Sequence, residues 1–306
     1  MKQEVKTDKF TFESGYDGLT LHATAYLPKK PKGILQVVHG MCEHMGRYEE
    51  MLQYFAENGY VACGFDQRGH GASAPFETDL GWFGDTEGKA VVDDAVRFTR
   101  LMKERYPGIP VYLYGHSMGS MIARCYLQEH DGEIDKLIVS GSPNKNVLAG
   151  VAVLLAKGVK LVKSSRHRSK MLRNLSTGSG DDKFPGEGKN AWLTRDKSVV
   201  EAYNADPKCA FIFTVNGFEN LFNLLKNAYD DDLFQVSNPD LPIHFVAGSD
   251  DPIIGNEDKW LFGHRHLRER GYRNVSGKLY HGMRHEPHNE IGKEDVFADV
   301  LGFLEK

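Results

Sequence analysis

Short apolar runs and longer amphipathic segments alternate along most of this chain. The runs are rich in β-branched and aromatic residues and predict strands at 34–38, 61–65, 111–114, 137–139, 243–247 and 276–280. Between the runs, apolar residues recur about every 3.6 positions, which predicts helices at 48–58, 87–106, 118–129, 259–270 and 293–305. This alternation is typical of a doubly wound α/β fold, in which helices cover both faces of a mostly parallel sheet.

The opening stretch departs from this alternation. Residues 10–27 surround the turn residues Tyr16, Asp17 and Gly18, and they predict an antiparallel hairpin at the edge of the sheet.

A longer departure lies between residues 143 and 240, where no strand pattern occurs. Helical spacing of apolar residues and a turn-rich loop replace it, and we predict that this segment is a helical cap inserted between two strands. The core of the domain then comprises residues 1–142 and 241–306. The helical patterns of the cap are at 146–163, 198–203 and 218–229, and its loop is at 177–189.

The distribution of charged residues distinguishes the cap from the rest of the chain. The whole chain has 38 Lys and Arg against 42 Asp and Glu, a net charge of −4, which favours no nucleic-acid partner. The cap nevertheless carries a basic stretch without an acid: Lys157, Lys160, Lys163, Arg166, Arg168, Lys170 and Arg173. An apolar helix followed by such a stretch fits transient contact with an anionic membrane surface. It equally fits a phosphate-bearing substrate, or a solvated face that closes over the sheet.

Cysteine usage and the lack of apolar segments point to a soluble protein of a reducing compartment, and we expect the cytoplasm. The cysteines are far apart in sequence and show no metal-ligand spacing: Cys42, Cys63, Cys125 and Cys209. The first residues have no apolar core of a signal peptide. The longest apolar run, from Val147 to Ala156, is shorter than the ~20 residues of a spanning helix.

A candidate nucleophile lies in the sequence Gly115-His116-Ser117-Met118-Gly119. This G-x-S-x-G pattern follows a predicted strand and opens a predicted helix. A serine on such a turn is held in a strained backbone, with its hydroxyl exposed above the sheet. The flanking glycines avoid collisions with neighbouring backbone. We therefore predict Ser117 as a nucleophile.

A serine hydroxyl needs a base that takes its proton and an acid that orients the base. In doubly wound hydrolases these follow later strands, in the order serine, acid, histidine. Spacing alone does not choose among the candidates, which are the acids Asp250 and Asp251 and the histidines His281, His285 and His288.

The same histidine cluster resembles a zinc motif. However, His285-Glu286-Pro287-His288 is one residue short of H-E-x-x-H, and the proline would disrupt the required helix. We therefore expect neither a metal nor a cofactor.

Acyl transfer also needs donors for the negative charge on the carbonyl oxygen. Backbone amides suffice. Met118 follows the nucleophile, and Met41 lies in the loop after an early strand. These two N–H groups are the predicted oxyanion hole.

Taken together, these motifs resemble the monoacylglycerol lipase and lysophospholipase branch of the α/β-hydrolase superfamily. The resemblance covers about residues 10–145 and 240–305, and the cap is not matched closely. It rests on H-G-M-C-E-H-M-G-R-Y from His39, D-Q-R-G-H-G-A-S from Asp66, the serine motif, and G-x-x-D from Gly248. The resemblance implies an α/β-hydrolase fold.

The resemblance also implies roles for individual residues. In the family pattern Asp251 is the acid and His285 is the base, and the amides of Met41 and Met118 form the oxyanion hole. Glu43 and Arg47 match a loop beside the polar headgroup pocket, although a salt-bridged brace explains them equally well.

The implied activity is hydrolysis of the carboxylic ester of a monoacyl lipid, either a monoacylglycerol or a lysophospholipid, by a serine hydrolase that forms an acyl-enzyme. Alternatives with the same triad are a thioesterase, an aminopeptidase and a hydrolase of short or aryl esters. A homologue that binds a ligand without turnover is a further alternative, which the complete Ser117, Asp251 and His285 set disfavours.

Overall fold

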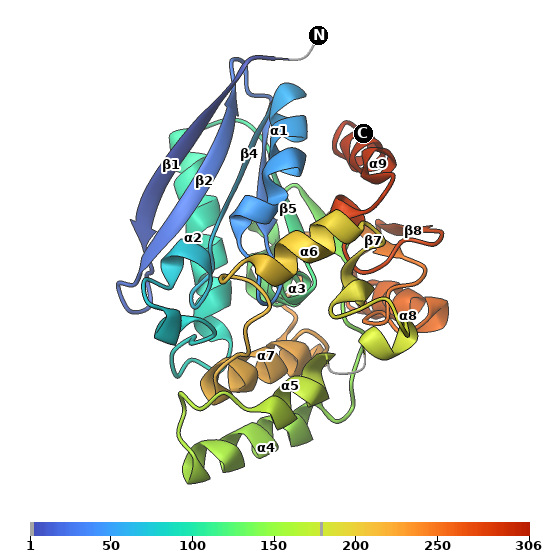
Figure 1. The fold of residues 1–306 in the computed structure, drawn as a ribbon. Coiled ribbons are helices and arrows are strands. Elements are labelled where there is room, and N and C mark those ends of the chain that lie inside the picture. Colours follow the sequence, from blue (N-terminus) through green and yellow to red (C-terminus); the bar gives the residue numbers. More distant parts are fainter. Residues whose placement is uncertain (1–2, 178–179) are drawn as a thin grey trace.

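A computed structural model describes residues 3–177 and 180–306, and its centre is one eight-stranded sheet with the strand order β1-β2-β4-β3-β5-β6-β7-β8 (Figure 1). The strand bounds are β1 Val5–Glu13, β2 Thr20–Pro28, β3 Gly33–Val38, β4 Tyr60–Phe65, β5 Val111–His116, β6 Lys136–Ser140, β7 Ile243–Gly248 and β8 Val275–Tyr280.

The pairing of the strands confirms the predicted, mostly parallel sheet. Strands β4, β3, β5, β6, β7 and β8 are neighbours and run parallel, and the apolar runs of the sequence form them. The predicted hairpin forms β1 and β2, which pair antiparallel, and β2 also pairs antiparallel with β4. Parallel strands expose their carboxyl ends at one edge, so the loops after β3, β5, β7 and β8 meet there.

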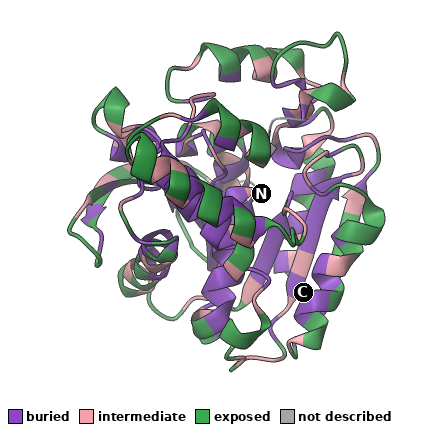
Figure 2. Ribbon diagram, turned by 90° about the horizontal axis from the view of Figure 1, so that it is seen from below, coloured by how far each residue is buried: buried purple, intermediate pink, exposed green. Residues whose placement is uncertain are grey.

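Helices cover both faces of the sheet. One core contains α1 and α9, and the other contains α2, α3 and α8. Figure 2 shows that the strands are mostly buried and that the outer faces of the surrounding helices are exposed. The bounds of these helices are α1 Glu49–Glu57, α2 Lys89–Arg105, α3 Met118–His130, α8 Glu257–Glu269 and α9 Lys293–Leu304.

Residues 143–240, which we call the cap segment, lie between β6 and β7. Helices α4, α5 and α7 lie together at one end of the molecule (Figure 1). Apart from one isolated bridge between Arg168 and Thr214, the described residues of the segment contain no strand. Its α-helices are α4 Ala149–Val162, α5 Lys170–Thr177, α6 Lys197–Ala205 and α7 Val215–Asn227.

Four of the seven basic residues of the stretch from Lys157 to Arg173 tie the cap segment to the loop before α2. Lys157 binds Glu87 at 2.7 Å, and Lys160 binds Asp85 at 2.5 Å. Arg166 binds Asp79 at 3.0 Å, and Arg168 donates to the carbonyl oxygen of Glu77 at 3.0 Å. Much of this charge therefore attaches the cap segment to the rest of the domain.

The surface of α4 is apolar on its outer side. Its small residues Ala149, Ala152 and Ala156 are buried, whereas Leu154 and Leu161 are 68% and 89% exposed. Within residues 3–177 and 180–306, no helix combines the length and the apolar character that crossing a bilayer requires.

Candidate active site

Ser117 occupies the sharp turn between β5 and α3. Its backbone angles are φ 51° and ψ −116°, and a positive φ is a strained conformation for a residue with a side chain. The turn needs its glycines. A Cβ on Gly119 would lie 2.0 Å from the carbonyl oxygen of Val38, and one on Gly115 would lie 2.4 Å from that of Gly119. The close packing of this turn against β3 therefore holds the hydroxyl of Ser117 in place.

Two buried groups from later strands meet this hydroxyl. His285 follows β8, and its Nε2 lies 2.9 Å from Ser117 Oγ. Its Nδ1 lies 2.9 Å from Oδ2 of Asp251, which follows β7. The other oxygen of Asp251 accepts from the N–H of Ile253 at 2.7 Å, which fixes the carboxylate. The geometry is that of a Ser–His–Asp triad, with the serine, acid and histidine in the predicted chain order.

The remaining candidates from the sequence point elsewhere. Asp250 and His281 are exposed. His288 is buried, stacks on Tyr48 with ring centroids 4.5 Å apart, and makes no hydrogen bond to any described residue. Burial lowers the pKa of His288 to about 4, so it stays neutral.

Asp251 controls the protonation of His285. Burial is the largest single influence on this imidazole and by itself lowers the pKa. The charge and the hydrogen bond of Asp251 oppose burial, and the net effect raises the pKa of His285 above 6.5. A buried carboxylate that favours imidazolium is what a base needs when it takes the proton of the attacking serine.

The two predicted oxyanion donors are free. The N–H groups of Met41 and Met118 donate to no acceptor among the described residues. A hydrogen bond fixes the loop that carries Met41: His70 Nε2 accepts from the N–H of Cys42 at 3.3 Å. His39 Nε2 also accepts from the N–H of Gln67 at 3.0 Å. These contacts explain why histidines occur in both loop motifs.

Glu43 and Arg47 form a buried brace. Arg47 contacts Glu43 at 2.6 Å and binds both oxygens of Glu286 at 2.7 and 2.6 Å. Glu43 also accepts from the hydroxyl of Tyr48 at 2.8 Å. Burial opposes the charge of Arg47, but the carboxylates of Glu286 and Glu43 raise its pKa well above the ordinary value. Most hydrogen-bonding capacity of this pair is therefore used within the protein, although Glu43 also lines the active-site cavity.

Several neighbours of His285 could not be predicted from the sequence. Trp192 of the cap segment packs against the imidazole of His285, with ring centroids 4.9 Å apart. The carbonyl oxygen of Trp192 also accepts from the backbone N–H of His285 at 3.3 Å. The ring of His116 also packs against that of His285, with ring centroids 4.8 Å apart. The adjacency of Glu286 to the base was visible in the sequence, but nothing there indicated the contact with Trp192.

A cavity of about 550 Å³ lies between the cap segment and the loops around Ser117. This volume lies within the range of small-molecule sites, ~300–1,000 Å³. The cavity is lined by both apolar and polar side chains. Apolar lining residues include Met121, Leu221, Phe222, Leu225 and Ile253, and polar lining residues include Arg173, Ser176, Asn190 and Tyr203.

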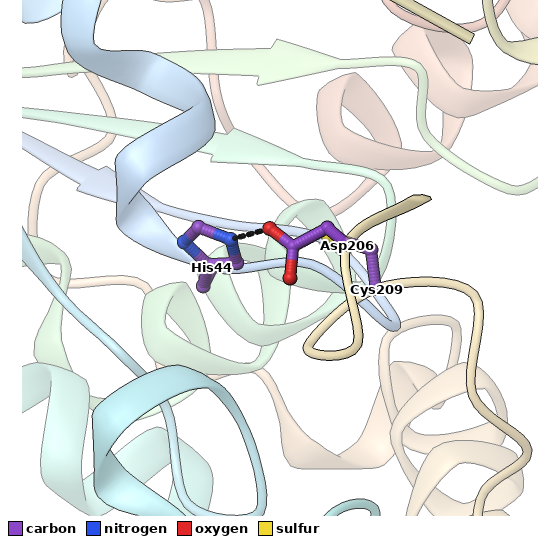
Figure 3. A group of neighbouring side chains, drawn as sticks. All are labelled: His44, Asp206 and Cys209. Carbon is purple, nitrogen blue, oxygen red and sulfur yellow. Dashed lines mark hydrogen bonds and ion pairs between the residues drawn. The ribbon is translucent and has the colours of Figure 1, made fainter. Parts of the chain in front are cut away.

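One group of possible metal ligands lies beside the loop of the oxyanion hole: His44, Asp206 and Cys209 (Figure 3). Hydrogen bonds account for its polar atoms. His44 Nδ1 accepts from the N–H of Gly46 at 3.1 Å, so the proton of the neutral ring is on Nε2, which donates to Asp206 at 2.8 Å. Burial raises the pKa of the Cys209 thiol far above its usual range. A protonated nitrogen and a thiol are poor metal ligands.

The parallel sheet, the strained serine turn and the triad geometry define the chain as an α/β-hydrolase. A family model described as serine aminopeptidase, S33, matches residues 29–292, and the chain belongs to this family.

Individual relatives agree with this assignment. The monoacylglycerol lipase of Mycolicibacterium smegmatis is 27% identical over 293 residues, which cover 95% of this chain and 96% of the relative. The monoglyceride lipase of Saccharomyces cerevisiae is 32% identical over 290 residues, with 90% and 85% covered. A highly thermostable carboxyl esterase from Bacillus coagulans, solved with glycerol, has a TM-score of 0.90 at 26% identity over 99% of both chains. The predicted resemblance to the monoacylglycerol lipase branch is thus confirmed.

Proposed function

We propose that this protein hydrolyses the carboxylic ester of monoacyl lipids through an acyl-enzyme on Ser117. His285 takes the hydroxyl proton as Ser117 attacks the ester carbonyl, and it returns the proton to the leaving alcohol. Asp251 orients the imidazole, and the amides of Met41 and Met118 bind the oxyanion. Water then attacks the acyl-enzyme with His285 as the base. The 2.9 Å contact between Ser117 Oγ and His285 Nε2, two residues that line the cavity, carries this proposal.

The cavity and the relatives support a lipid ester as the substrate. An acyl chain fits the apolar wall formed by Met121, Leu221, Phe222 and Leu225. The relatives from Mycolicibacterium smegmatis and Saccharomyces cerevisiae are named monoacylglycerol and monoglyceride lipases.

Labelling with a fluorophosphonate probe tests the nucleophile. We expect stoichiometric modification at Ser117, and none in Ser117→Ala. A matched control is Ser142→Ala, which removes another buried hydroxyl that bonds to no described residue. Labelling at another residue, or in neither protein, contradicts the proposal.

A substrate panel tests the bond and the acyl length. It comprises p-nitrophenyl esters from acetyl to palmitoyl, monooleoylglycerol, a palmitoyl thioester and an aminoacyl amide. We expect the long acyl esters to have the highest kcat/KM, because they fill the apolar wall. A preference for the acetyl ester, the thioester or the amide contradicts the lipid assignment. It would instead indicate a short-chain esterase, a thioesterase or an aminopeptidase, respectively.

We further propose that the outer face of α4 touches the membrane surface from which the lipid is drawn. Large apolar side chains are exposed there, and an interfacial helix buries such a face among lipid headgroups. The exposed apolar residues of α4 are Val151, Leu154, Leu155, Leu161 and Val162, and Val147 and Leu148 are exposed immediately before the helix.

Sedimentation with phosphatidylcholine vesicles tests this contact. We expect the double variant Leu154→Ser and Leu161→Ser to bind vesicles at least tenfold more weakly, while it hydrolyses a water-soluble ester normally. Ile291→Ser is the control, because Ile291 is also exposed, at 58%, but lies outside the cap segment. If the double variant binds vesicles as strongly as Ile291→Ser does, the proposed contact between α4 and the membrane is rejected.

We place the activity in the cytoplasm, as a reducing compartment fits the four cysteines, all of which are buried free thiols. Fractionation of cells that express the chain tests this placement. Recovery of the active protein outside the cytoplasm contradicts it.

A further inference from the structure

Cys42, the residue after the proposed oxyanion donor Met41, has an uncommon backbone conformation. Its φ is 57°, in the left-handed region that residues with a side chain seldom adopt. Such a conformation persists only where the surrounding structure fixes it. The contacts of Cys42 therefore determine the course of the loop at this point.

All three polar groups of Cys42 are hydrogen-bonded, and two of the bonds go to the cap segment. The N–H donates to His70 Nε2 in the core of the domain, at 3.3 Å. The carbonyl oxygen accepts from the N–H of Ala210 at 3.3 Å, and the thiol donates to the carbonyl oxygen of Phe211 at 3.0 Å. Burial raises the pKa of this thiol well above its ordinary value, so the thiol remains a donor. Ala210 also has a positive φ, of 54°, so both ends of this link have uncommon conformations.

Two further contacts join the same part of the cap segment to the same loop. His44 donates from Nε2 to Asp206 at 2.8 Å (Figure 3). The guanidinium of Arg47 lies over the ring of Tyr203, 4.7 Å from its centroid. Residues 203–211, which we call the docking segment, therefore lie along this loop.

The direction of the Met41 N–H depends on the peptide groups on both sides of Met41. Because a peptide group is planar, this N–H points away from the carbonyl oxygen of Gly40, which accepts from His39 Nδ1 at 2.8 Å. Core residues thus fix one side. The other side is the peptide group shared with Cys42, and two of the three hydrogen bonds of Cys42 come from the docking segment.

We propose that the cap segment positions the oxyanion hole through its bonds to Cys42, which set the direction of the Met41 N–H. Cys42 is then a positioning residue. This inference rests on the proposed ester hydrolysis and adds a requirement to it: the hole has its full shape only while the docking segment contacts the loop. Oxyanion donors bind the tetrahedral intermediate more strongly than the ester, so a displaced donor lowers kcat and leaves KM unchanged.

Substitution of the thiol tests this role, with p-nitrophenyl butyrate as the substrate. We expect Cys42→Ala to lower kcat about tenfold at unchanged KM, a part of the ~10²–10³-fold that removal of an oxyanion donor costs. Cys42→Ser should recover much of the loss, because the serine hydroxyl donates to the same carbonyl oxygen. The matched control is Cys125→Ala. It removes another buried thiol, which donates to the cap residue Leu224 at 3.7 Å and lies outside the cavity lining, so kcat should not change.

A transition-state analogue separates positioning from a general loss of structure. An octyl trifluoromethyl ketone adds to Ser117 as a hemiketal, and the oxyanion of this adduct occupies the hole. Its Ki should rise in Cys42→Ala by the same factor by which kcat/KM falls. The pH midpoint of kcat/KM should stay in place, because the contact between His285 and Asp251 is unchanged.

A second variant weakens the link from the cap side. Asp206→Ala removes the partner of His44, so it should lower kcat severalfold at unchanged KM, and it tests the proposal even if Cys42→Ala does not fold. The control is Asp196→Ala, which removes the N-cap at the other end of α6 and should leave kcat unchanged.

The outcomes separate this inference from the proposed function. An unchanged kcat in Cys42→Ala, with or without a higher KM, rejects the positioning role and leaves ester hydrolysis intact. An equal loss of kcat in Cys125→Ala, or in Cys42→Ser, also rejects it, because general packing rather than the hydrogen bond would explain the loss. Absence of hydrolysis by the unchanged protein, together with absence of labelling at Ser117, rejects the proposed function.

Discussion

Asp251 differs from its neighbour Asp250 only in the direction that the turn after β7 gives its side chain. Consecutive residues of an extended or turning chain point to different sides, so Asp251 faces His285 while Asp250 faces solvent. Among the three histidines after β8, His285 contacts Ser117 and Asp251, His281 is exposed, and His288 is buried against Tyr48. The residue types are the same for the correct and incorrect choices, and their packing in the folded chain makes the distinction.

At the residue scale, we predict that activity rises with pH through the pKa of His285. The base works only when neutral, and Asp251 raises its pKa above 6.5, so kcat/KM should reach half its maximum above pH 6.5. In Asp251→Asn burial remains without the opposing carboxylate, and the midpoint should move to lower pH. The rate itself should fall by about 10⁴-fold.

Profiles of kcat/KM against pH with a p-nitrophenyl ester measure both effects. His281→Gln is the control, because His281 is exposed and should not change the profile. A midpoint that stays in place in Asp251→Asn contradicts the assigned contact between acid and base.

We also predict that Arg47 is important for stability. Arg47→Met leaves the buried carboxylates of Glu43 and Glu286 without their cation. Such a loss costs about 3–5 kcal/mol in the free energy of unfolding, measurable by urea denaturation. Lys29→Met is the control, because its pair with Glu4 is exposed and should contribute less than about 1 kcal/mol. A similar small effect for both variants would show that the brace does not stabilise the fold.

At the scale of elements, the periodicity of apolar residues predicts that α4 is a helix but does not predict which of its faces is buried. The apolar pattern correctly predicts a helix at this position, but large and small apolar residues occur on different sides of it. The alanine side packs against α7, and the side with Leu154 and Leu161 faces outward. Close approach of two helices favours small side chains, so the most hydrophobic face is the exposed one. The buried face could not be identified from hydrophobicity alone.

The ties between the cap segment and the loop before α2 yield a prediction at this scale. Lys160 binds Asp85 at 2.5 Å and the buried Glu219 at 3.2 Å. Lys160→Met leaves Glu219 underpaired, so the free energy of unfolding should fall by about 1–3 kcal/mol.

Thermal and urea denaturation measure this change. Lys163→Met is the matched control, since Lys163 is exposed and its side chain binds no residue in the described part of the chain. Equal stability of the two variants would mean that the ties do not hold the cap segment.

At the scale of the whole molecule, the proposed site supplies the nucleophile, the base, the acid and the oxyanion donors from the chain itself. We therefore predict that EDTA leaves kcat and KM unchanged. Activity that is lost in EDTA and restored by zinc would contradict this prediction and would direct attention to His44, Asp206 and Cys209.

Local sequence patterns were enough to predict the succession of strands and helices along the chain, the edge hairpin and the position of the candidate nucleophile. These features depend on local periodicity and on turn residues, which are readable within a few neighbouring positions. The family resemblance then indicated Asp251, His285, Met41 and Met118.

Tertiary structure decided what depends on contacts between distant segments. It determined that Trp192 packs against His285, that Glu286 completes the brace of Arg47, and that four residues of the basic stretch tie the cap segment to the loop before α2. Residues far apart in a chain meet only after the whole sheet has formed. No local pattern records which of them will become neighbours.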